Sequence, residues 1–242
     1  MLEGMYTAAA GMAAQQQRLD AVASDLANVN TTGYKKLRVA FRDLVYTPAN
    51  GGAQPAVQEG AGAAASVIGR GAAQGALQRT DRPLDVALNG PGFLRVTNGA
   101  GQQVLTRDGA LQIDNQNRLV TASGHLTGVS VPAGTSPDSV AIGPDGRVTV
   151  ANRAAGRLEV VAVNSPAGLL ARGGNTFAPT AASGAPAAAA ATTVEQGSLE
   201  ASNVDVGESF TEMIESQRAY ELGSRAIRMQ DELLGIANGI KR

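Results

Sequence analysis

The sequence predicts an α+β protein. Paired N- and C-terminal helices are expected to form a coiled-coil-like α domain, and the central region an antiparallel β domain. Three observations support this expectation. Apolar residues recur every seven positions near both ends, turn dipeptides separate short alternating segments in the middle, and alanine and glycine dominate over bulky apolar residues. A seven-residue repeat is typical of a helix seam, whereas alternation with period two is typical of strands.

The N-terminal helix is expected to run from Leu2 to about Ala27, a stretch without proline. The segment Asn28–Gly33 should end it, because Asn, β-branched Thr and Gly all disfavour continuation of a helix. The seven-residue row consists of Met5, Met12, Leu19 and Leu26.

A second helix is expected over roughly residues 204–238. Asp205 and Glu208 have capping-box spacing at its start. At 1.5 Å per residue this helix would be about 50 Å long. Its seven-residue row contains Met213, Tyr220, Ile227 and Leu234.

Between the helices, turn dipeptides such as Asp108-Gly109 and Asp145-Gly146 separate short alternating segments, which predicts an antiparallel meander. The expected strands are Leu84–Asn89, Phe93–Val96, Val104–Arg107, Leu111–Ile113, Leu119–Thr121, Val129–Val131, Val140–Ile142, Val148–Val150 and Leu158–Val163. Two low-complexity stretches, residues 49–66 and 178–193, are interpreted as loops or extended connectors, with a short helix at Ala187–Ala191 as an alternative.

These elements give four expected regions. Residues 1–30 are the N-terminal helix of the α (polymerisation) domain, 31–79 an extended connector with a Gly/Ala-rich segment, 80–198 the β domain, and 199–242 the C-terminal helix.

Composition excludes several functions. The 242 residues carry a formal net charge of −1 and scattered basic residues, so neither nucleic acid nor an acidic membrane is an expected partner. The absence of cysteine excludes disulfides and thiolate metal sites. No segment has the roughly 18 consecutive apolar residues of a membrane span, and the N-terminus lacks the features of a cleaved secretory signal.

Catalytic chemistry is not expected, because the candidate groups do not form a constellation. The single histidine, His125, is interpreted as a surface or packing residue. Asp81 and Asp85 could be a carboxylate pair, but Arg79 and Arg82 beside them favour ordinary surface ion pairing. The protein is therefore expected to be no enzyme, and to need no cofactor, metal or small-molecule substrate.

The two apolar stripes allow two interpretations. The helices could form only an intramolecular hairpin, or they could also polymerise. Small residues on several faces of the first helix, in Ala8–Gly11 and Ala13-Ala14, would let more than one neighbour approach closely. The stripes alone do not decide between the two.

Three motifs resemble those of the flagellar basal-body rod and hook proteins. The segment Leu26–Lys35, with Asn28, Asn30, Gly33 and Tyr34, is similar to their N-terminal motif. Gly90–Phe93 and Leu105–Gly109 resemble the signature of their β domain. The C-terminal motif is matched by Ser202–Asp205 with Asn203, and by Gln217, Arg218 and Tyr220 in Gln217–Glu221.

The resemblance is strongest to the distal-rod members and implies a structural subunit that polymerises helically into a rigid, torque-transmitting shaft. It also implies export by the flagellar type III apparatus and a place in the basal body, spanning the periplasm or cell wall. The implied partners are further copies of the chain, other rod proteins, hook protein and envelope ring proteins. The two apolar rows would then form the helix interface. The alternatives are a proximal-rod or other hook–basal-body paralogue, or a stalked β-domain binding module.

Overall fold

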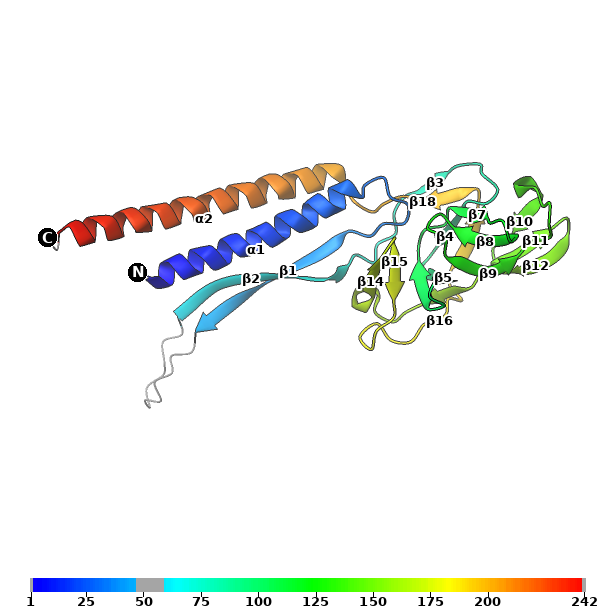
Figure 1. The fold of residues 1–242 in the computed structure, drawn as a ribbon, viewed down its shortest axis with the longest axis horizontal. Coiled ribbons are helices and arrows are strands. Elements are labelled where there is room, and N and C mark those ends of the chain that lie inside the picture. The colour runs from blue at the N-terminus through cyan, green and yellow to red at the C-terminus, as the bar shows by residue number, and fades with distance from the viewer. Residues whose placement is uncertain (1, 47–58, 241–242) are drawn as a thin grey trace. The chain divides into compact units, whose positions relative to one another are not determined.

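A computed structural model describes residues 2–46 and 59–240, and the chain divides into two compact units (Figure 1). The first unit comprises residues 1–26, 37–68 and 205–242, and the second comprises 27–36 and 69–204. The first holds two helices and a two-stranded ribbon, and the second contains antiparallel strands joined by loops and by two short 3-10 helices, Pro137–Ser139 and Pro166–Gly168. The predicted α+β class is confirmed.

Both helices occur where the seven-residue rows place them. Helix α1 spans Leu2–Ala27, and helix α2 spans Val206–Ile240, starting two residues later than expected. Asp205 caps α2, because its Oδ1 accepts a hydrogen bond from the backbone N–H of Glu208 at 2.8 Å. This bond satisfies one of the N–H groups that a helix start leaves without a partner.

The two helices pack side by side in opposite directions. Arg18 of α1 meets Glu215 of α2, with 3.5 Å between guanidinium and carboxylate. Farther along, Gly223 lies against Met12, whose Cγ would be only 2.6 Å from a Cβ placed on the glycine. A glycine inside a helix costs about 1 kcal/mol relative to alanine. Here it makes room for the methionine.

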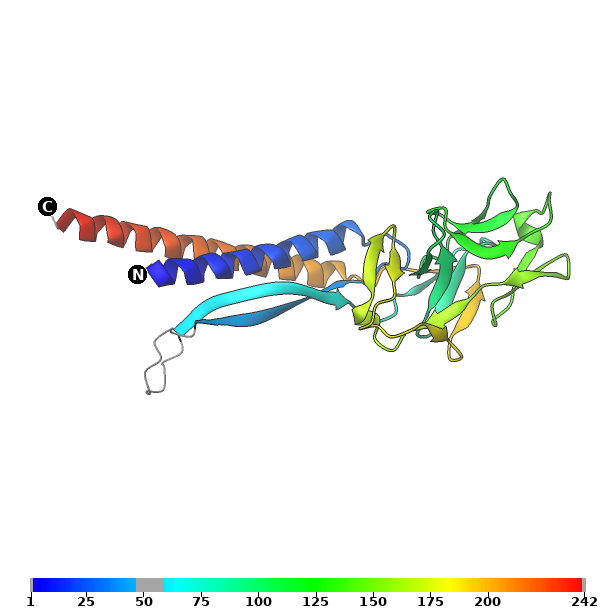
Figure 2. The same cartoon turned by 60° about the horizontal axis from the view of Figure 1, so that its bottom comes forward.

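Strands β1 (Leu37–Tyr46) and β2 (Glu59–Arg70) form a two-stranded sheet that runs along α1, as Figures 1 and 2 show. A Cβ placed on Gly62 of β2 would lie 3.0 Å from the Cβ of Ala10, so the ribbon approaches α1 closely. Helix α1 is therefore covered by both α2 and the ribbon. Its fully buried apolar residues are Ala14, Ala21 and Val22.

Within the expected extended connector at residues 31–79, two segments pair as the β1–β2 ribbon. Residues 59–66, interpreted as a low-complexity loop or connector, belong to strand β2, and residues 47–58 lie outside the described residues. The alanines and glycines of this stretch have a packing role, because small residues let a strand lie close against a helix.

The second unit is a set of antiparallel ladders. Its largest sheet has the order β14-β15-β6-β5-β9-β8-β7, and β13 joins it beside β5 and carries β16. Smaller sheets are β10-β11-β12, β17-β4 and β18-β3. The bounds are β3 Leu77–Arg79, β4 Val86–Asn89, β5 Phe93–Thr97, β6 Gln103–Thr106, β7 Leu111–Ile113, β8 Arg118–Thr121, β9 Leu126–Ser130, β10 Val140–Ile142, β11 Arg147–Val150, β12 Arg153–Arg157, β13 Val160–Ala162, β14 Leu170–Gly173, β15 Thr176–Ala178, β16 Ala187–Ala188, β17 Thr193–Gln196 and β18 Ser198–Glu200.

The core of this unit contains the apolar residues whose alternation predicted the strands. Leu88, Leu94, Leu119 and Val148 are almost fully buried in one cluster. Each predicted strand in residues 84–163 overlaps an observed one. Strand β18 lies in this unit, whereas the sequence placed residues 199–204 with the C-terminal helix. The alanine run forms the short strand β16, and no helix forms there.

Gly109, which follows β6, lies directly against the backbone of β4. The Val86 N–H donates to the Gly109 carbonyl at 3.0 Å, and a Cβ on Gly109 would overlap the Val86 carbonyl oxygen. Glycine is required here because two backbone segments touch.

We expect Gly109→Ala to lower the free energy of unfolding by about 1–3 kcal/mol, because the added methyl group forces the two segments apart. Urea unfolding followed by circular dichroism measures this change. Gly99→Ala is the matched control, since nothing lies within 4 Å of a Cβ at that position. Equal stability of the two variants would contradict the close contact.

Candidate functional site

The most unusual local feature of the molecule is a buried charge cluster around Glu200, which is 1% exposed. One carboxylate oxygen accepts a hydrogen bond from Lys35 Nζ at 2.5 Å, and the other accepts one from an Arg107 guanidinium nitrogen at 2.7 Å. The backbone N–H of Gly75 adds a bond at 2.9 Å. We call Lys35, Arg107 and Glu200 the junction cluster.

The junction cluster joins parts of the chain that are far apart in sequence. Lys35 follows the end of α1, Arg107 follows β6, and Glu200 ends β18 shortly before α2. The backbone reinforces the joint, because the N–H of Gly33 donates to the Glu200 carbonyl at 2.7 Å. Gly33 has a φ of +65°, and a Cβ there would lie 2.5 Å from the Arg107 carbonyl oxygen. A larger residue would push the N-terminal segment off the β unit.

Further bonds satisfy most of the polar atoms of the junction cluster. Lys35 Nζ also donates to the Ala73 carbonyl at 2.7 Å, and Arg107 donates to the Gly90 carbonyl at 2.8 Å. The guanidinium of Arg107 lies 5.4 Å from the ring centroid of Phe93, a cation–π distance. Only Arg107 Nε among the atoms of this cluster is buried without a hydrogen-bond partner in the described part of the chain.

Burial and ion pairing shift the pKa in opposite directions, both for Glu200 and for Lys35. Burial alone raises the pKa of a carboxyl, but Arg107, Lys35 and the Gly75 N–H hold the pKa of Glu200 below its ordinary value. Burial lowers the pKa of Lys35 from its ordinary value, and the hydrogen bond to Glu200 only partly offsets this. In this geometry the Glu200 carboxylate lies between the Lys35 ammonium and the Arg107 guanidinium.

The structure brings several of the predicted motif residues to this junction. Tyr34 is 5% exposed, its carbonyl accepts the Asn203 N–H at 3.3 Å, and Asn203 Oδ1 accepts the Lys36 N–H at 2.7 Å. Asn28 shapes the turn after α1, since its Oδ1 accepts a bond from the Thr31 hydroxyl at 3.1 Å. Asn30 is exposed.

The other predicted site residues lie in the helical unit. Three of them, Gln217, Arg218 and Tyr220, are exposed on α2 and take no part in the junction cluster. Tyr220 retains 42% exposure. The remaining members of the two seven-residue rows are half-buried: Met5, Met12, Leu19, Leu26, Met213, Ile227 and Leu234.

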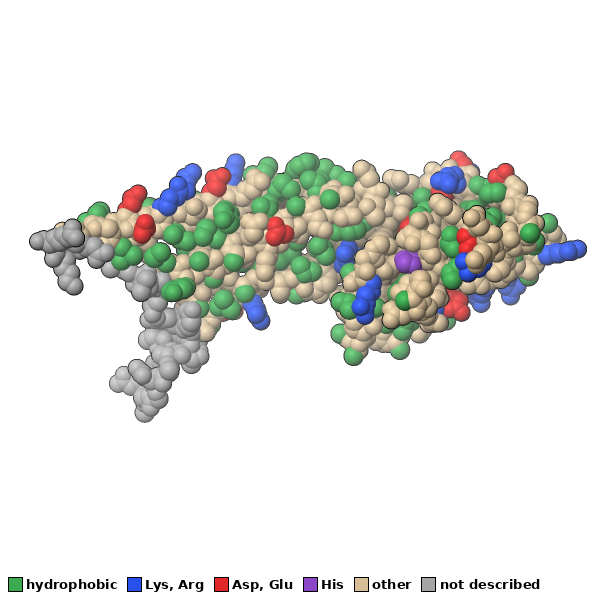
Figure 3. Space-filling view, in the orientation of Figure 1, with side chains coloured by type: hydrophobic (Ala, Val, Ile, Leu, Met, Phe, Trp, Pro, Cys, Tyr) green, Lys and Arg blue, Asp and Glu red, His purple; other side chains and the backbone are tan. Residues whose placement is uncertain are grey.

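Helix α2 carries a stripe of exposed apolar side chains, which we call the α2 stripe. Its members range from 48% to 65% exposed, and apolar side chains are visible along the helical unit in Figure 3. Single exposed apolar residues are common, but several that gather on one side of a helix indicate an interaction surface. The α2 stripe consists of Phe210, Ile214, Leu222, Met229, Leu233 and Ile236.

The residues considered for catalysis do not assemble. Asp81 pairs with Arg79 at the exposed surface, as expected, but Asp85 is 1% exposed and its Oδ2 accepts a hydrogen bond from Thr80 at 2.8 Å. The prediction of surface ion pairing was thus wrong for Asp85, because this residue is buried where its backbone bridges to Ala110. His125 is half-buried, with its backbone N–H bonded to the Thr121 hydroxyl. No metal-binding group of His, Asp and Glu occurs in residues 2–46 and 59–240.

The junction cluster has no local signature in the sequence. Lys35 and Arg107 belong to the motif segments Leu26–Lys35 and Leu105–Gly109, whereas Glu200 lies outside the motifs. Its two partners are 165 and 93 residues away along the chain, so no spacing pattern links the three.

We expect Glu200→Gln to lower the free energy of unfolding by about 3–5 kcal/mol, because it leaves two buried cations without a counter-charge. Urea unfolding measures the loss. Asp81→Asn serves as the control, since its pair with Arg79 is exposed and screened by solvent and should contribute little to stability. A loss at Glu200 as small as that at Asp81 would show that the cluster does not hold the junction.

The lowered pKa of Glu200 also predicts a pH dependence. A carboxyl with a depressed folded-state pKa stabilises the fold above its ordinary pKa of 4.5, and this contribution is lost as the pH falls through the folded value. The stability difference between the wild type and Glu200→Gln should be constant at neutral pH and shrink below about pH 4.5. Urea midpoints over a pH series test this. A difference that persisted into strong acid would contradict it.

Comparisons with known proteins identify the family. Three family models match in sequence order: "Flagella basal body rod protein" over residues 5–35, "Flagellar hook protein FlgE/F/G D1 domain" over 87–150, and "Flagellar basal body rod FlgEFG protein C-terminal" over 195–240. Each contains one segment of the junction cluster: Lys35, Arg107 and Glu200 in turn. None of the helices in the described residues is long and apolar enough to cross a membrane.

Full-length relatives agree with these matches. The chain is 38% identical to the flagellar basal-body rod protein FlgG of Borreliella burgdorferi and 34% identical to that of Bacillus subtilis, in both cases over 100% of each chain. It is also 34% identical to the flagellar hook-basal body complex protein FlhP of Bacillus subtilis, again over 100% of each chain. These relatives are structural proteins of the flagellar basal body, and they indicate no enzymatic family. The chain belongs to the FlgG family of flagellar basal-body rod proteins.

Proposed function

We propose that this protein is a structural subunit of the distal rod, and that it polymerises through α1 and α2 into a rigid tubular shaft that transmits torque. The full-length similarity to FlgG proteins carries the proposal. The role is mechanical, so it requires no cofactor and no active site.

The helical unit supplies the polymer contacts in this proposal. The two seven-residue rows form a coiled-coil-like interface between α1 and α2, with Leu26 near the end of α1 and Ile227 in the second half of α2. Because most of these residues are only half-buried within one chain, neighbouring copies complete their burial. The α2 stripe, exposed in one chain, becomes the main contact between copies. Burying an apolar side chain of this size gains about 1.5–3 kcal/mol.

The further partners follow from the family. Other rod proteins and hook protein would continue the shaft at its two ends, and envelope ring proteins would surround it. The subunit would reach the assembly site through the flagellar export apparatus, without a cleaved signal.

A second candidate is another paralogue of the hook–basal body, such as a proximal-rod protein. The match to FlhP, which like the FlgG matches covers 100% of both chains, supports this alternative. The position of the protein in isolated basal bodies separates the two. A stalked β-domain binding module is a third possibility, and would form a small defined oligomer and no shaft.

We expect Leu233→Lys to abolish motility while leaving the isolated chain as stable as the wild type. Leu233 is 57% exposed in one chain, so a lysine costs nothing there, but it would bury an unpaired charge between copies. The measurements are swimming in soft agar, basal-body isolation and thermal unfolding of the purified chain.

Asp231→Lys is the matched control, because Asp231 is also exposed but lies about 160° around the helix from Leu233 at 100° per residue. It should leave motility intact. Motile cells carrying Leu233→Lys would show that the α2 stripe is not a contact between copies.

A further inference from the structure

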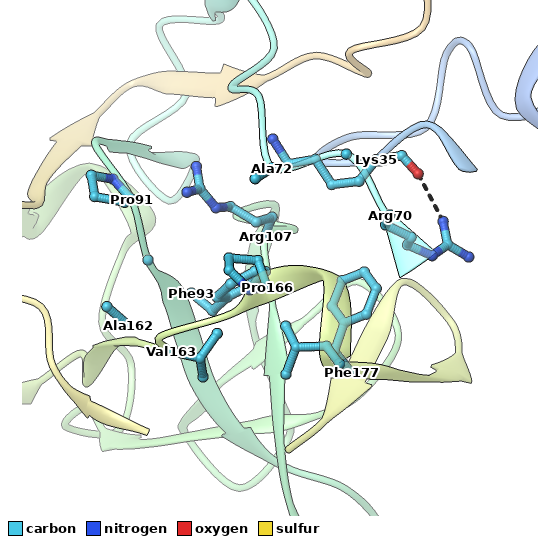
Figure 4. Close-up of a pocket in the computed structure, with 13 residues that line it drawn as sticks. Lys35, Arg70, Ala72, Pro91, Phe93, Arg107, Ala162, Val163, Pro166 and Phe177 are labelled. Carbon is cyan, nitrogen blue, oxygen red and sulfur yellow. Dashed lines mark hydrogen bonds between the residues drawn. The ribbon is translucent and has the colours of Figure 1, made fainter. Parts of the chain in front are cut away.

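The second unit contains a small pocket of about 70 Å³ beside the junction cluster (Figure 4). One side of the pocket is apolar and formed by Phe93, Val163, Pro166 and Phe177. Phe93 and Phe177 meet edge to face, with 5.8 Å between ring centroids, so this wall is rigid. The volume suits one or two side chains and is too small for a large ligand.

The remaining lining of the pocket is cationic. Lys35, Arg70 and Arg107 all line it, and none of its lining residues is acidic. Glu200, behind the lining, supplies a single carboxylate for Lys35 and Arg107 together. Among the described residues, three cations therefore share one anion at the pocket, and Arg107 Nε is buried without a hydrogen-bond partner. Such an excess of positive charge in a partly buried site favours binding of a further anion.

Arg70 is the cation best placed to receive that anion. Its guanidinium donates to the Lys35 carbonyl at 3.0 Å and lies 4.9 Å from the ring centroid of Tyr34 and 5.5 Å from that of Phe177. These contacts hold the group flat and oriented, yet Arg70 has no carboxylate partner among the described residues. An incoming carboxylate would find the planar fork of donors already fixed in position.

Strand β1 presents a matching surface in the other unit. Phe41, Asp43 and Val45 occupy alternate positions, so their side chains lie on one face of the strand. All three are exposed, with Phe41 at 44% and Val45 at 48%. Asp43 forms no ion pair with another described residue. A carboxylate between two exposed apolar side chains is the complement of a cation beside an apolar pocket.

The spacing of side chains along β1 agrees with the distance between Arg70 and the apolar wall of the pocket. Side chains two residues apart on a strand are separated by roughly 6.5–7 Å. The Arg70 guanidinium lies 5.5 Å from the Phe177 ring centroid, at the apolar wall. A strand can thus place a carboxylate on Arg70 and the neighbouring apolar side chain against that wall.

We propose that this pocket is a socket for a second copy of the chain, in which Asp43 of one copy pairs with Arg70 of the next and Phe41 or Val45 enters the apolar pocket. The inference rests on the proposed function, because it requires a homopolymer. It adds a specific contact between the ribbon of one copy and the β unit of another, separate from the helix contacts.

Site-directed cross-linking tests this contact, because the chain contains no cysteine. Cells producing the chain with both Asp43→Cys and Arg70→Cys are oxidised, and the basal-body fraction is run on a denaturing gel. We expect dimers and a ladder of larger species. The control pair is Arg42→Cys with Arg70→Cys, because residue 42 lies on the opposite face of β1. A link within single chains, or an equal ladder from the control pair, would overturn the socket.

Charge exchange provides the second readout. Asp43→Arg and Arg70→Asp should each reduce swimming severely, and the double variant should restore most of it. Circular dichroism of the purified variants checks that they fold. Wild-type swimming in folded single variants, or a double variant no better than the singles, would refute the pairing.

The two proposals fail in different ways. If the wild-type chain is built into basal bodies but the cysteine pair gives no ladder in motile cells, the socket is wrong and the rod function stands. If the wild-type chain is absent from basal bodies, the proposed function itself is wrong.

Discussion

The structure of the β unit depends on one buried carboxylate. Glu200 is almost fully enclosed, and its two oxygens hold Lys35 and Arg107, which come from two other parts of the chain. Burying three charges is costly, and apolar residues of the same volume often stabilise a fold as well or better. The junction cluster contributes to the specificity of the fold and not mainly to its stability. Each partner fits at one position only, so the segment after α1 and the segment before α2 are fixed to the same place on the β unit.

Helix α1 imposes the second constraint. It is packed by α2 and by the β1–β2 ribbon, and its alanines and glycine make these approaches possible. A helix covered on two sides has few positions at which bulky residues are tolerated. This explains why α1 itself is rich in alanine and has Tyr6 as its single aromatic residue. The larger apolar side chains are instead found on α2, the helix with an exposed stripe.

The sequence was most informative where a periodic pattern reflected burial. The seven-residue rows predicted both helices to within two residues. Alternation predicted the strands from Val86 to Ala162 except β12, whose residues are mostly exposed. Strands such as β14 and β2 were missed because they are exposed or rich in glycine and alanine, so burial leaves no alternating pattern. The motif residues Gly33, Tyr34 and Asn203 were found by resemblance. Their role at the junction required Glu200, whose partners are distant in sequence and leave no local pattern.

The unequal lengths of the two helices have a consequence for how copies can be arranged. Helix α2 has 35 residues and α1 has 26, so α2 is longer by roughly 14 Å at 1.5 Å per residue. The contacts of Arg18 with Glu215 and of Met12 with Gly223 place this excess at the C-terminal end of α2. At the end that holds the C-terminus of α2, the pair is therefore reduced to α2 alone, which carries apolar residues there. At the opposite end both helices are present. A head-to-tail arrangement, in which the C-terminal end of α2 meets a different surface of the next copy, covers the apolar residues and gives the assembly a direction.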